Sequence, residues 1–239
     1  MSKSRGTCFI CGTYGKITDD HIPPRKLYPI DIQNRYNLIT IYCCESCHKQ
    51  FSKDDKYLKT LLTSLTDETV DHPVAIERRE SVKRDLEDPK SRKFWAEIAR
   101  SMVPVWRQSQ GGIWIRRCRL NLNHDKLSAL FSRFVRGLFY REQGYKKIME
   151  SDVHFALIVP DDYGSKEKGI IYQNLGYISS APPTVKHDDV FEYRSQYFQD
   201  TVTLPHSIWH FRFYDAHDFF MIVYANEYKG PDGPQNLNS

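Results

Sequence analysis

The sequence lacks any long apolar run, which excludes a helix that spans a membrane. No window approaches the roughly 18 apolar residues that such a span requires. The residues before Cys8 contain no apolar stretch of the kind found in secretory signals. We therefore expect a cytoplasmic protein with no membrane partner, in a compartment where thiols stay reduced.

Internal repeats and low-complexity tracts are also absent. Apolar residues account for 40% and aromatic residues for 13% of the 239 positions. This composition excludes a disordered chain and can supply a sizeable core. The length suits one large domain or two modest ones.

Acidic residues are scarce in the first part of the chain and basic residues are scarce in the last. Residues 1–148 carry a net charge of +11 and residues 149–239 carry −7, although the whole chain carries only +4. This asymmetry indicates that the basic part meets a polyanion such as nucleic acid. The alternative is that it serves only to keep the surface soluble.

The residue pattern divides the chain into three segments. Residues 1–57 predict short strands and loops, broken by Gly and Pro, that end in a helix. Residues 58–148 predict a mainly helical segment. Residues 149–239 predict a β-rich region.

The helices are predicted by apolar residues that recur at helical spacing. Such spacing occurs over 58–65 and 94–102, and most clearly over 125–143. Gly144 stands where a glycine typically ends a helix. Arg133 and Arg136 are expected on the polar face of this last helix.

Strands in the third segment are predicted by runs of aromatic and β-branched residues. These runs cover 154–159, 208–214 and 219–225. Because their surroundings are acidic, their aromatic side chains are expected to fill a sheet core rather than stack on bases.

Two Cys-x-x-Cys pairs stand within the first 48 residues. They are Cys8 with Cys11 and Cys44 with Cys47. Structural zinc takes four such ligands in a tetrahedron, and each Cys-x-x-Cys turn brings two thiolates to one ion. The spacing predicts a structural Zn²⁺ site whose binding energy helps this region to fold. The alternative is a set of free thiols or a redox pair.

Two other cysteines are excluded from this site. Cys43 adjoins the second pair but lacks the spacing of a ligand. Cys118 stands alone and is expected to be a buried small hydrophobic residue.

Four more residues occur in a fixed order among the cysteines. Asp20-His21 precedes Ile-Pro-Pro, Asn37 precedes Leu, and His48 follows the second Cys pair. With these motifs, residues 8 to about 55 resemble the zinc-bearing branch of the HNH endonuclease family. The resemblance covers less than a quarter of the chain.

The resemblance implies a ββα-metal fold and a role for each residue. His21 would be the general base that activates water, a task that suits a side chain titrating near neutral pH. Asp20 and His48 would hold a catalytic divalent ion, and Asn37 would hold the backbone that orients His21. The implied reaction is hydrolysis of DNA phosphodiester bonds. The alternative is a zinc-stabilised turn whose histidines satisfy local hydrogen bonds.

The implied ion site has few protein ligands. Ser52 stands one helical turn beyond His48, where some family members, such as the nuclease colicins, carry another His. An Asp and His set with open positions favours Mg²⁺ or Mn²⁺ over catalytic zinc. Asp19 is expected to be a solvated turn residue.

Adjacent ligands pose a geometric condition. Neighbouring residues of a strand point to opposite faces. Asp20 and His21 can therefore serve one site only if the strand ends or twists there, and Pro23 and Pro24 fit such an ending.

Basic residues around the motif are candidate contacts for DNA phosphates. They are Arg25, Lys26, Lys49 and Lys53. This basic surface could be widened by Arg133 and Arg136 and by the Arg116-Arg117-Cys118-Arg119 run. For any one of them the alternative is a solvated position.

Taken together, the sequence predicts an α+β protein. It would consist of an N-terminal ββα-metal module with structural zinc, a basic helical segment and an acidic, antiparallel β-rich region. The expected function is a metal-dependent DNA endonuclease, and the alternative is a non-catalytic zinc-stabilised module that binds nucleic acid. A homodimer would make double-strand cutting easier, and the acidic region would suit a protein partner.

Overall fold

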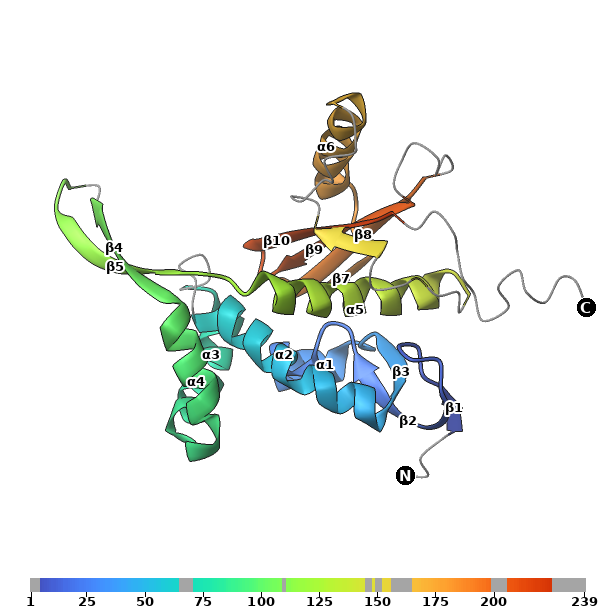
Figure 1. Cartoon of the computed structure of the whole chain (residues 1–239), viewed down its shortest axis with the longest axis horizontal. Coiled ribbons are helices and arrows are strands. Elements are labelled where there is room, and N and C mark those ends of the chain that lie inside the picture. Colours follow the sequence, from blue (N-terminus) through green and yellow to red (C-terminus); the bar gives the residue numbers. More distant parts are fainter. Residues whose placement is uncertain are drawn as a thin grey trace, which may run out of the picture.

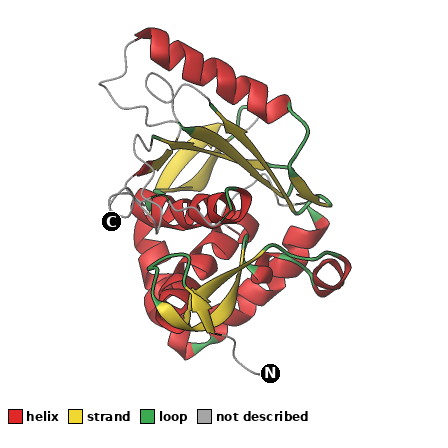
Figure 2. Ribbon diagram, turned by 90° about the vertical axis from the view of Figure 1, so that its right-hand side faces the viewer, coloured by secondary structure: helices red, strands yellow, loops and turns green. Residues whose placement is uncertain are grey.

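The computed structural model describes residues 5–64, 71–108, 111–144, 148, 152–155, 165–198 and 206–224. The described elements stack in layers (Figures 1 and 2). An N-terminal module lies on one side of helix α5 (His124–Glu142), a β-sheet lies on the other, and helix α6 (Ser165–Ser180) covers the far face of the sheet. None of the described helices is both long and apolar enough to cross a membrane.

The N-terminal module contains a three-stranded antiparallel sheet followed by a long helix. The strands, in the order β1-β2-β3, are β1 (Arg5–Thr7), β2 (Tyr14–His21) and β3 (Thr40–Cys44). Helix α2 (Glu45–Ser64) follows β3 directly. Short helices η1 (Arg25–Leu27) and α1 (Ile30–Arg35) connect β2 to β3. The predicted strands that end in a helix are confirmed.

The middle of the chain is partly helical. Its helices are α3 (Pro73–Glu87), η2 (Pro89–Ser91) and α4 (Arg92–Ser101). A two-stranded antiparallel hairpin, β4 (Met102–Gln108) and β5 (Trp114–Leu120), interrupts them. The prediction of a mainly helical segment is confirmed, but the hairpin was not expected, and its alternating β-branched residues Val103, Val105 and Ile115 favour strands.

The C-terminal region contains a five-stranded antiparallel sheet in the order β6-β10-β9-β8-β7. Its strands are β6 (Val153–Phe155), β7 (Val185–His187), β8 (Phe191–Tyr197), β9 (Ser207–Phe213) and β10 (His217–Val223). The predicted strands near 208–214 and 219–225 are confirmed. Residues 156–159 of the third predicted strand lie outside the described residues.

Helix α6 is a correction to the expectation that this whole region is β. Its Leu175 and Ile178, three residues apart, lie on one side of the helix and pack with Ile208 and Ile222 of the sheet. The spacing of Leu175 and Ile178 is that of a helix, whereas the sequence analysis expected strands throughout this region.

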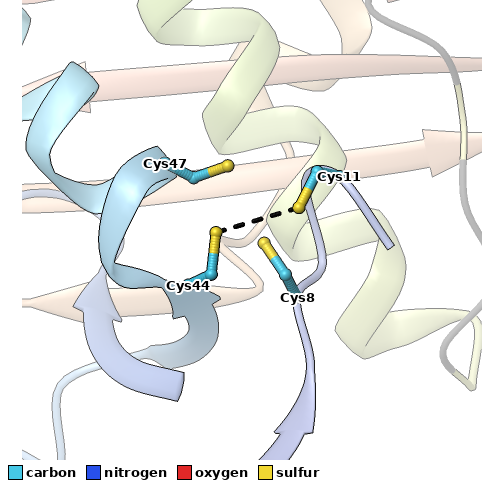
Figure 3. A group of neighbouring side chains, drawn as sticks. All are labelled: Cys8, Cys11, Cys44 and Cys47. Carbon is cyan, nitrogen blue, oxygen red and sulfur yellow. Dashed lines mark hydrogen bonds between the residues drawn. The ribbon is translucent and has the colours of Figure 1, made fainter. Parts of the chain in front are cut away.

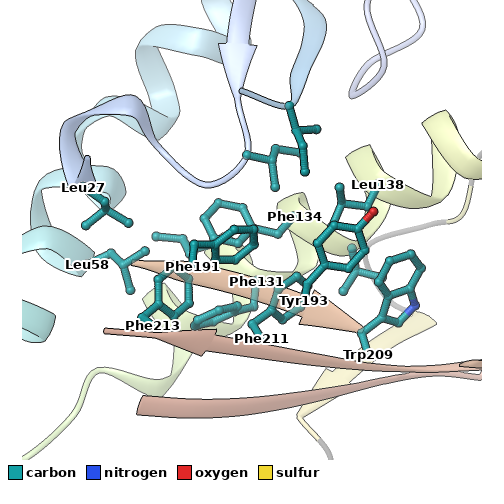
Figure 4. Packing of buried hydrophobic residues seen from close by; sticks show 14 of the residues in the cluster. Leu27, Leu58, Phe131, Phe134, Leu138, Phe191, Tyr193, Trp209, Phe211 and Phe213 are labelled. Carbon is teal, nitrogen blue, oxygen red and sulfur yellow. The ribbon is translucent and has the colours of Figure 1, made fainter. Parts of the chain in front are cut away.

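Helix α5 has the predicted bounds to within a residue, and Gly144 follows it in the left-handed conformation, at φ +64°. Its aromatic residues Phe131 and Phe134 pack against the inward side chains of β8 and β9 (Figure 4). Those side chains include Phe191, Tyr193, Trp209, Phe211 and Phe213, all buried. The expectation that these aromatics fill a sheet core is confirmed.

The opposite side of α5 contacts the N-terminal module. A Cβ on Gly137 would lie 2.4 Å from the Ile22 side chain, so glycine allows this close approach. The Tyr28 hydroxyl and His187 Nδ1 also lie 2.9 Å apart, linking the module to the sheet. One cluster of buried apolar side chains includes residues from all three predicted segments.

Candidate functional site

Four cysteine side chains converge at one end of the N-terminal module (Figure 3). Cys8 and Cys11 lie in the turn between β1 and β2, Cys44 ends β3, and Cys47 lies in the first turn of α2. Their four sulfur atoms lie within 4.8 Å of one another, and those of Cys11 and Cys44 are 3.8 Å apart. Tetrahedral zinc with bonds of about 2.3 Å requires sulfurs about 3.8 Å apart. The predicted set of four sulfurs is confirmed, and it fits one Zn²⁺ ion.

Local backbone structure positions the first pair. The Gly12 N–H donates to the Cys8 carbonyl over 2.9 Å and closes the turn. Gly12 has a φ of +76°, which glycine adopts without the strain a side chain would cause. The turn therefore directs the thiols of Cys8 and Cys11 to the same side.

The second pair gains from the start of α2. Hydrogen bonds from the Ser46 hydroxyl and the Cys47 backbone lower the pKa of the Cys44 thiol to about 6. A thiolate is the form that binds a metal, so this position is prepared for one at neutral pH.

The remaining two cysteines differ in their surroundings. Cys43 is buried beside the cluster but is not a member of it, as expected. Cys118 is exposed on β5, so the prediction that it is buried is wrong. Its strand belongs to a hairpin with little surface against the core.

Asp20 and His21 point to opposite faces of the β2–β3 hairpin. The strand pairing is regular to its end, with Asp20 opposite Ile41 and His21 opposite Thr40. Asp20 and Ile41 are both buried, whereas His21 and Thr40 are partly exposed. The strand does end at His21, but without a twist that turns both side chains to one side.

Asp20 lies in a buried group of charges. Arg133 of α5 is 1% exposed, and its Nη2 donates to Asp55 Oδ1 over 2.6 Å. Its Nε lies 4.0 Å from Asp20 Oδ2. The guanidinium also lies over the Phe51 ring at 4.6 Å. Among the described residues, neither Asp20 Oδ2 nor Arg133 Nε has a hydrogen-bond partner.

The expectation that Arg133 lies on a polar helix face is therefore wrong. Helix α5 is covered on two sides, by the module and by the sheet, so residues beside its apolar stripe are buried too. Arg136 is partly buried, and its side chain donates to the carbonyls of Ile10 and Ile148. Neither arginine is available as a solvated DNA contact.

We expect the Arg133→Met variant to lower the free energy of unfolding by about 3–5 kcal/mol, since it leaves the buried Asp20 and the partly buried Asp55 without their cation. Adding Asp55→Asn should recover part of this loss, because one of the two unpaired charges is removed. Urea unfolding of the single and double variants measures both effects. An Arg133→Met protein as stable as wild type would contradict the assignment of this ion pair.

His21 has a defined hydrogen-bond arrangement. The Thr40 hydroxyl donates its proton to the Leu38 carbonyl over 3.1 Å, and its oxygen lies 3.2 Å from His21 Nδ1. Because that proton is already used, the oxygen accepts from Nδ1–H, which leaves Nε2 as the basic nitrogen. Burial, and then the charge of Arg25, lower the pKa of His21, which favours the neutral ring.

The face that carries His21 and Thr40 borders a cavity of about 480 Å³. Asp19, Asn37, Thr40, Tyr42, Tyr140 and Arg141 are among the residues that line it. Asn37 is exposed there, and Asp19 is a strand residue rather than a turn residue. The expectation of a solvated turn at Asp19 is right about its exposure, and its position two residues before His21 places both side chains on one face of β2.

His48 lies on the other side of the hairpin. It lines a cavity of about 210 Å³ with Thr18 of β2 and Glu45 of α2. Thr18 and Asp20 are two residues apart on β2, so His48 lies over the same face as Asp20. Within the described ranges, Asp20, His21 and His48 do not form a second cluster of metal ligands like that of the cysteines.

The four basic residues expected to contact DNA are all exposed. Arg25 donates to Gln33 over 2.5 Å, and Lys49 pairs with Glu45 at 2.8 Å. The effect of Arg25 on the His21 pKa places its positive charge near that ring. Lys26 and Lys53 are exposed on η1 and α2.

Comparison with known proteins does not assign this chain to a family. No protein-family model matches the chain, and neither curated proteins nor solved structures include a detectable relative.

Proposed function

We propose that the protein is a metal-dependent DNA endonuclease of the HNH type. The observation that carries this proposal is the setting of His21. Its Nδ1 is tied to Thr40 on a β-hairpin, and the cysteine cluster ties that hairpin to the helix that carries His48. A neutral, oriented imidazole on the same strand face as cavity-lining Asp19 and Thr40 suits general-base chemistry.

His21 Nε2 would take a proton from the attacking water, while Thr40 holds the ring from its other nitrogen. Arg25, Lys26, Lys49 and Lys53 would hold the DNA backbone by its phosphates. A divalent ion, Mg²⁺ or Mn²⁺, would neutralise charge on the leaving oxygen. The carboxylate of Asp20 and the ring of His48, on α2, would supply its oxygen and nitrogen ligands. Because Asp20 points to the face of β2 opposite His21, this ligand set requires the end of β2 to turn so that both residues face one phosphate.

The buried ion pair places a condition on this ligand set. Arg133 competes for the Asp20 carboxylate, so an ion at Asp20 must displace or accompany the guanidinium. Asp19 is the other candidate carboxylate ligand for the ion. It lines a cavity with Asn37 and lies on the same face of β2 as His21. The two carboxylates therefore define two versions of the site that variants can separate.

Cleavage of supercoiled plasmid tests the proposal. The protein is incubated with the plasmid and Mg²⁺, Mn²⁺ or no added ion, and elemental analysis is made of the same sample. We expect nicking or cutting that depends on the added ion, with one equivalent of zinc retained throughout. The absence of ion-dependent cleavage at any protein concentration used would reject the proposal.

We expect Thr40→Val to slow cleavage about tenfold or more, because it removes the acceptor that holds His21 Nδ1–H while keeping the side-chain shape. The fold should persist, since Thr40 is only partly buried. Thr40→Ser keeps the hydroxyl and should restore most of the rate. Equal rates for the Val and Ser variants would show that the hydroxyl does not position His21.

A second candidate is a zinc-stabilised module that binds nucleic acid without cutting it. The ion pair of Asp20 with Arg133 favours it, because a structural pair is a sufficient reason for a buried carboxylate at this position. This candidate predicts salt-dependent DNA binding that is the same with and without Mg²⁺ or Mn²⁺, and no cleavage.

A further inference from the structure

The β4–β5 hairpin projects away from the helices and from the five-stranded sheet (Figure 1). It follows α4 directly, and the Asn121 N–H closes its base by donating to the Ser101 carbonyl over 2.8 Å. Each strand contains seven residues, and the pairing is regular from Met102–Leu120 to Gln108–Trp114. The two described strands therefore form a regularly paired arm with most of their surface in solvent.

The arm is positively charged along its length. Residues 102–120 contain four arginines and no Asp or Glu, a net charge of +4. The arginines are Arg107, Arg116, Arg117 and Arg119. All four are exposed, and the described residues supply none of them with an ion pair. This charge is thus available for an anionic partner.

The arm also exposes aromatic surface. Trp106 is 66% exposed and Trp114 is 62% exposed. Trp106 lies opposite Arg116 in the pairing, and Trp114 lies two residues from Arg116 on the same strand. The two rings therefore flank one arginine on one face of the arm. Large exposed apolar side chains grouped in this way mark an interaction surface.

We propose that the β4–β5 hairpin is a DNA-binding arm that lies in the major groove of a duplex. A two-stranded β-ribbon fits this groove, which is about 12 Å wide. Arg107 and Arg117 lie on the face opposite Arg116 and the tryptophans, so arginines on both faces can reach phosphates while the rings contact base edges. The inference rests on DNA as the substrate under the proposed function but does not depend on catalysis.

Helix α2 connects the arm to the candidate site. Its first turn carries Cys47 and His48, and from its middle Lys56 donates to Ser91, the residue before α4, over 2.6 Å. The eight residues from His48 to Lys56 rise about 12 Å along the helix. Helix α4 then lies between this point and the hairpin, so the arm would anchor the DNA away from the cleaved bond.

Binding of a labelled 30-base-pair duplex to the full chain, without added Mg²⁺ or Mn²⁺, tests the arm. We expect the triple variant R116A/R117A/R119A to bind at least tenfold more weakly and to reduce the slope of log K against log salt by about 2–3. The matched control K83A/R84A/K90A removes the same charge from exposed positions on α3 and η2. It should bind within about twofold of wild type.

Tryptophan fluorescence and an RNA duplex give independent readouts. DNA should quench the emission of Trp106 and Trp114, and W106F/W114F should lose this change while it keeps the arginine contacts. An RNA duplex should bind at least tenfold more weakly, since its major groove is too narrow for the arm.

Three results would overturn the inference: equal affinities for the triple variant and its control, no DNA-dependent change in the emission of wild type, or equal binding of RNA. A wild-type dimer that the hairpin substitutions dissociate with no change in DNA affinity would also overturn it, and would assign the arm to a second copy of the chain. Arm-dependent binding without any cleavage would instead reject only the proposed catalysis.

Discussion

Replacing Cys44 with Ser is expected to abolish zinc binding and to unfold the N-terminal module. Zinc in four-ligand sites of small modules contributes on the order of 10 kcal/mol, which is comparable to the total stability of a typical domain. Serine keeps the size of the side chain but supplies no thiolate, and it also removes the low-pKa position of the set. Elemental analysis should show loss of the metal, and thermal unfolding should occur at a much lower temperature.

The neighbouring cysteine provides a matched control. Cys43→Ser changes the same chemical group one residue away, but this side chain lies in the core and outside the cluster. That variant should keep its zinc and lose only the modest stability that a buried hydroxyl costs. Cys118→Ser, at an exposed position, should match wild type in both measurements. A Cys44→Ser protein that retains one equivalent of zinc would disprove the assignment of the cluster.

The cysteine cluster was predictable because its information is local. Each Cys-x-x-Cys motif by itself predicts two ligands for one ion. Only the approach of the two motifs to each other depends on the fold. Helix α5 was predictable for a similar reason, since its apolar spacing extends from Leu127 to Phe139, more than three turns. In both cases one strong repeated signal outweighs the ambiguity of single residues.

The environment of Asp20 could not be predicted in this way. Its neighbour Arg133 comes from a helix more than 100 residues later, and Arg133 in turn bonds Asp55, which is 78 positions away. No spacing rule relates such residues. The opposite orientations of Asp20 and His21 were foreseeable from strand alternation, but the outcome depended on whether β2 stays regular to its last residue, as it does.

The β4–β5 hairpin was missed because helical spacing continues across its first residue. Phe94, Trp95 and Ile98 lie in α4, and Met102 extends their spacing by one more turn although it begins β4. The alternation of Val103 and Val105 is too short to outweigh that pattern. Its exposed tryptophans could have suggested a strand, but exposure itself becomes visible only in the fold.

Replacing His21 with Ala is expected to slow DNA cleavage by about 10²–10⁴-fold, the usual contribution of a general base. Zinc content and unfolding should stay near wild type, because His21 is partly exposed and its ring contacts the Thr40 hydroxyl at the end of the hairpin rather than the core. Cleavage of supercoiled plasmid at saturating Mg²⁺ or Mn²⁺ measures the rate. If His21→Ala cuts as fast as wild type, His21 is not the base and the proposed function loses its central residue.

Two neighbouring carboxylates then decide on which face the ion is held. Asp20→Asn and Asp19→Asn each remove one negative charge. Asp20 lies on the buried face of the hairpin, the side on which Arg133 and His48 also lie. Asp19 lies on the exposed face, which it shares with His21 and Asn37. If the ion is held by Asp20, the first variant loses cleavage, and some stability as well because Arg133 loses a counter-charge. If only the Asp19 variant loses cleavage and it unfolds like wild type, the ion is bound on the exposed face of the hairpin. Asp20 would then remain only as the buried partner of Arg133, and the chemistry would depend on the side of the hairpin where His21 already lies.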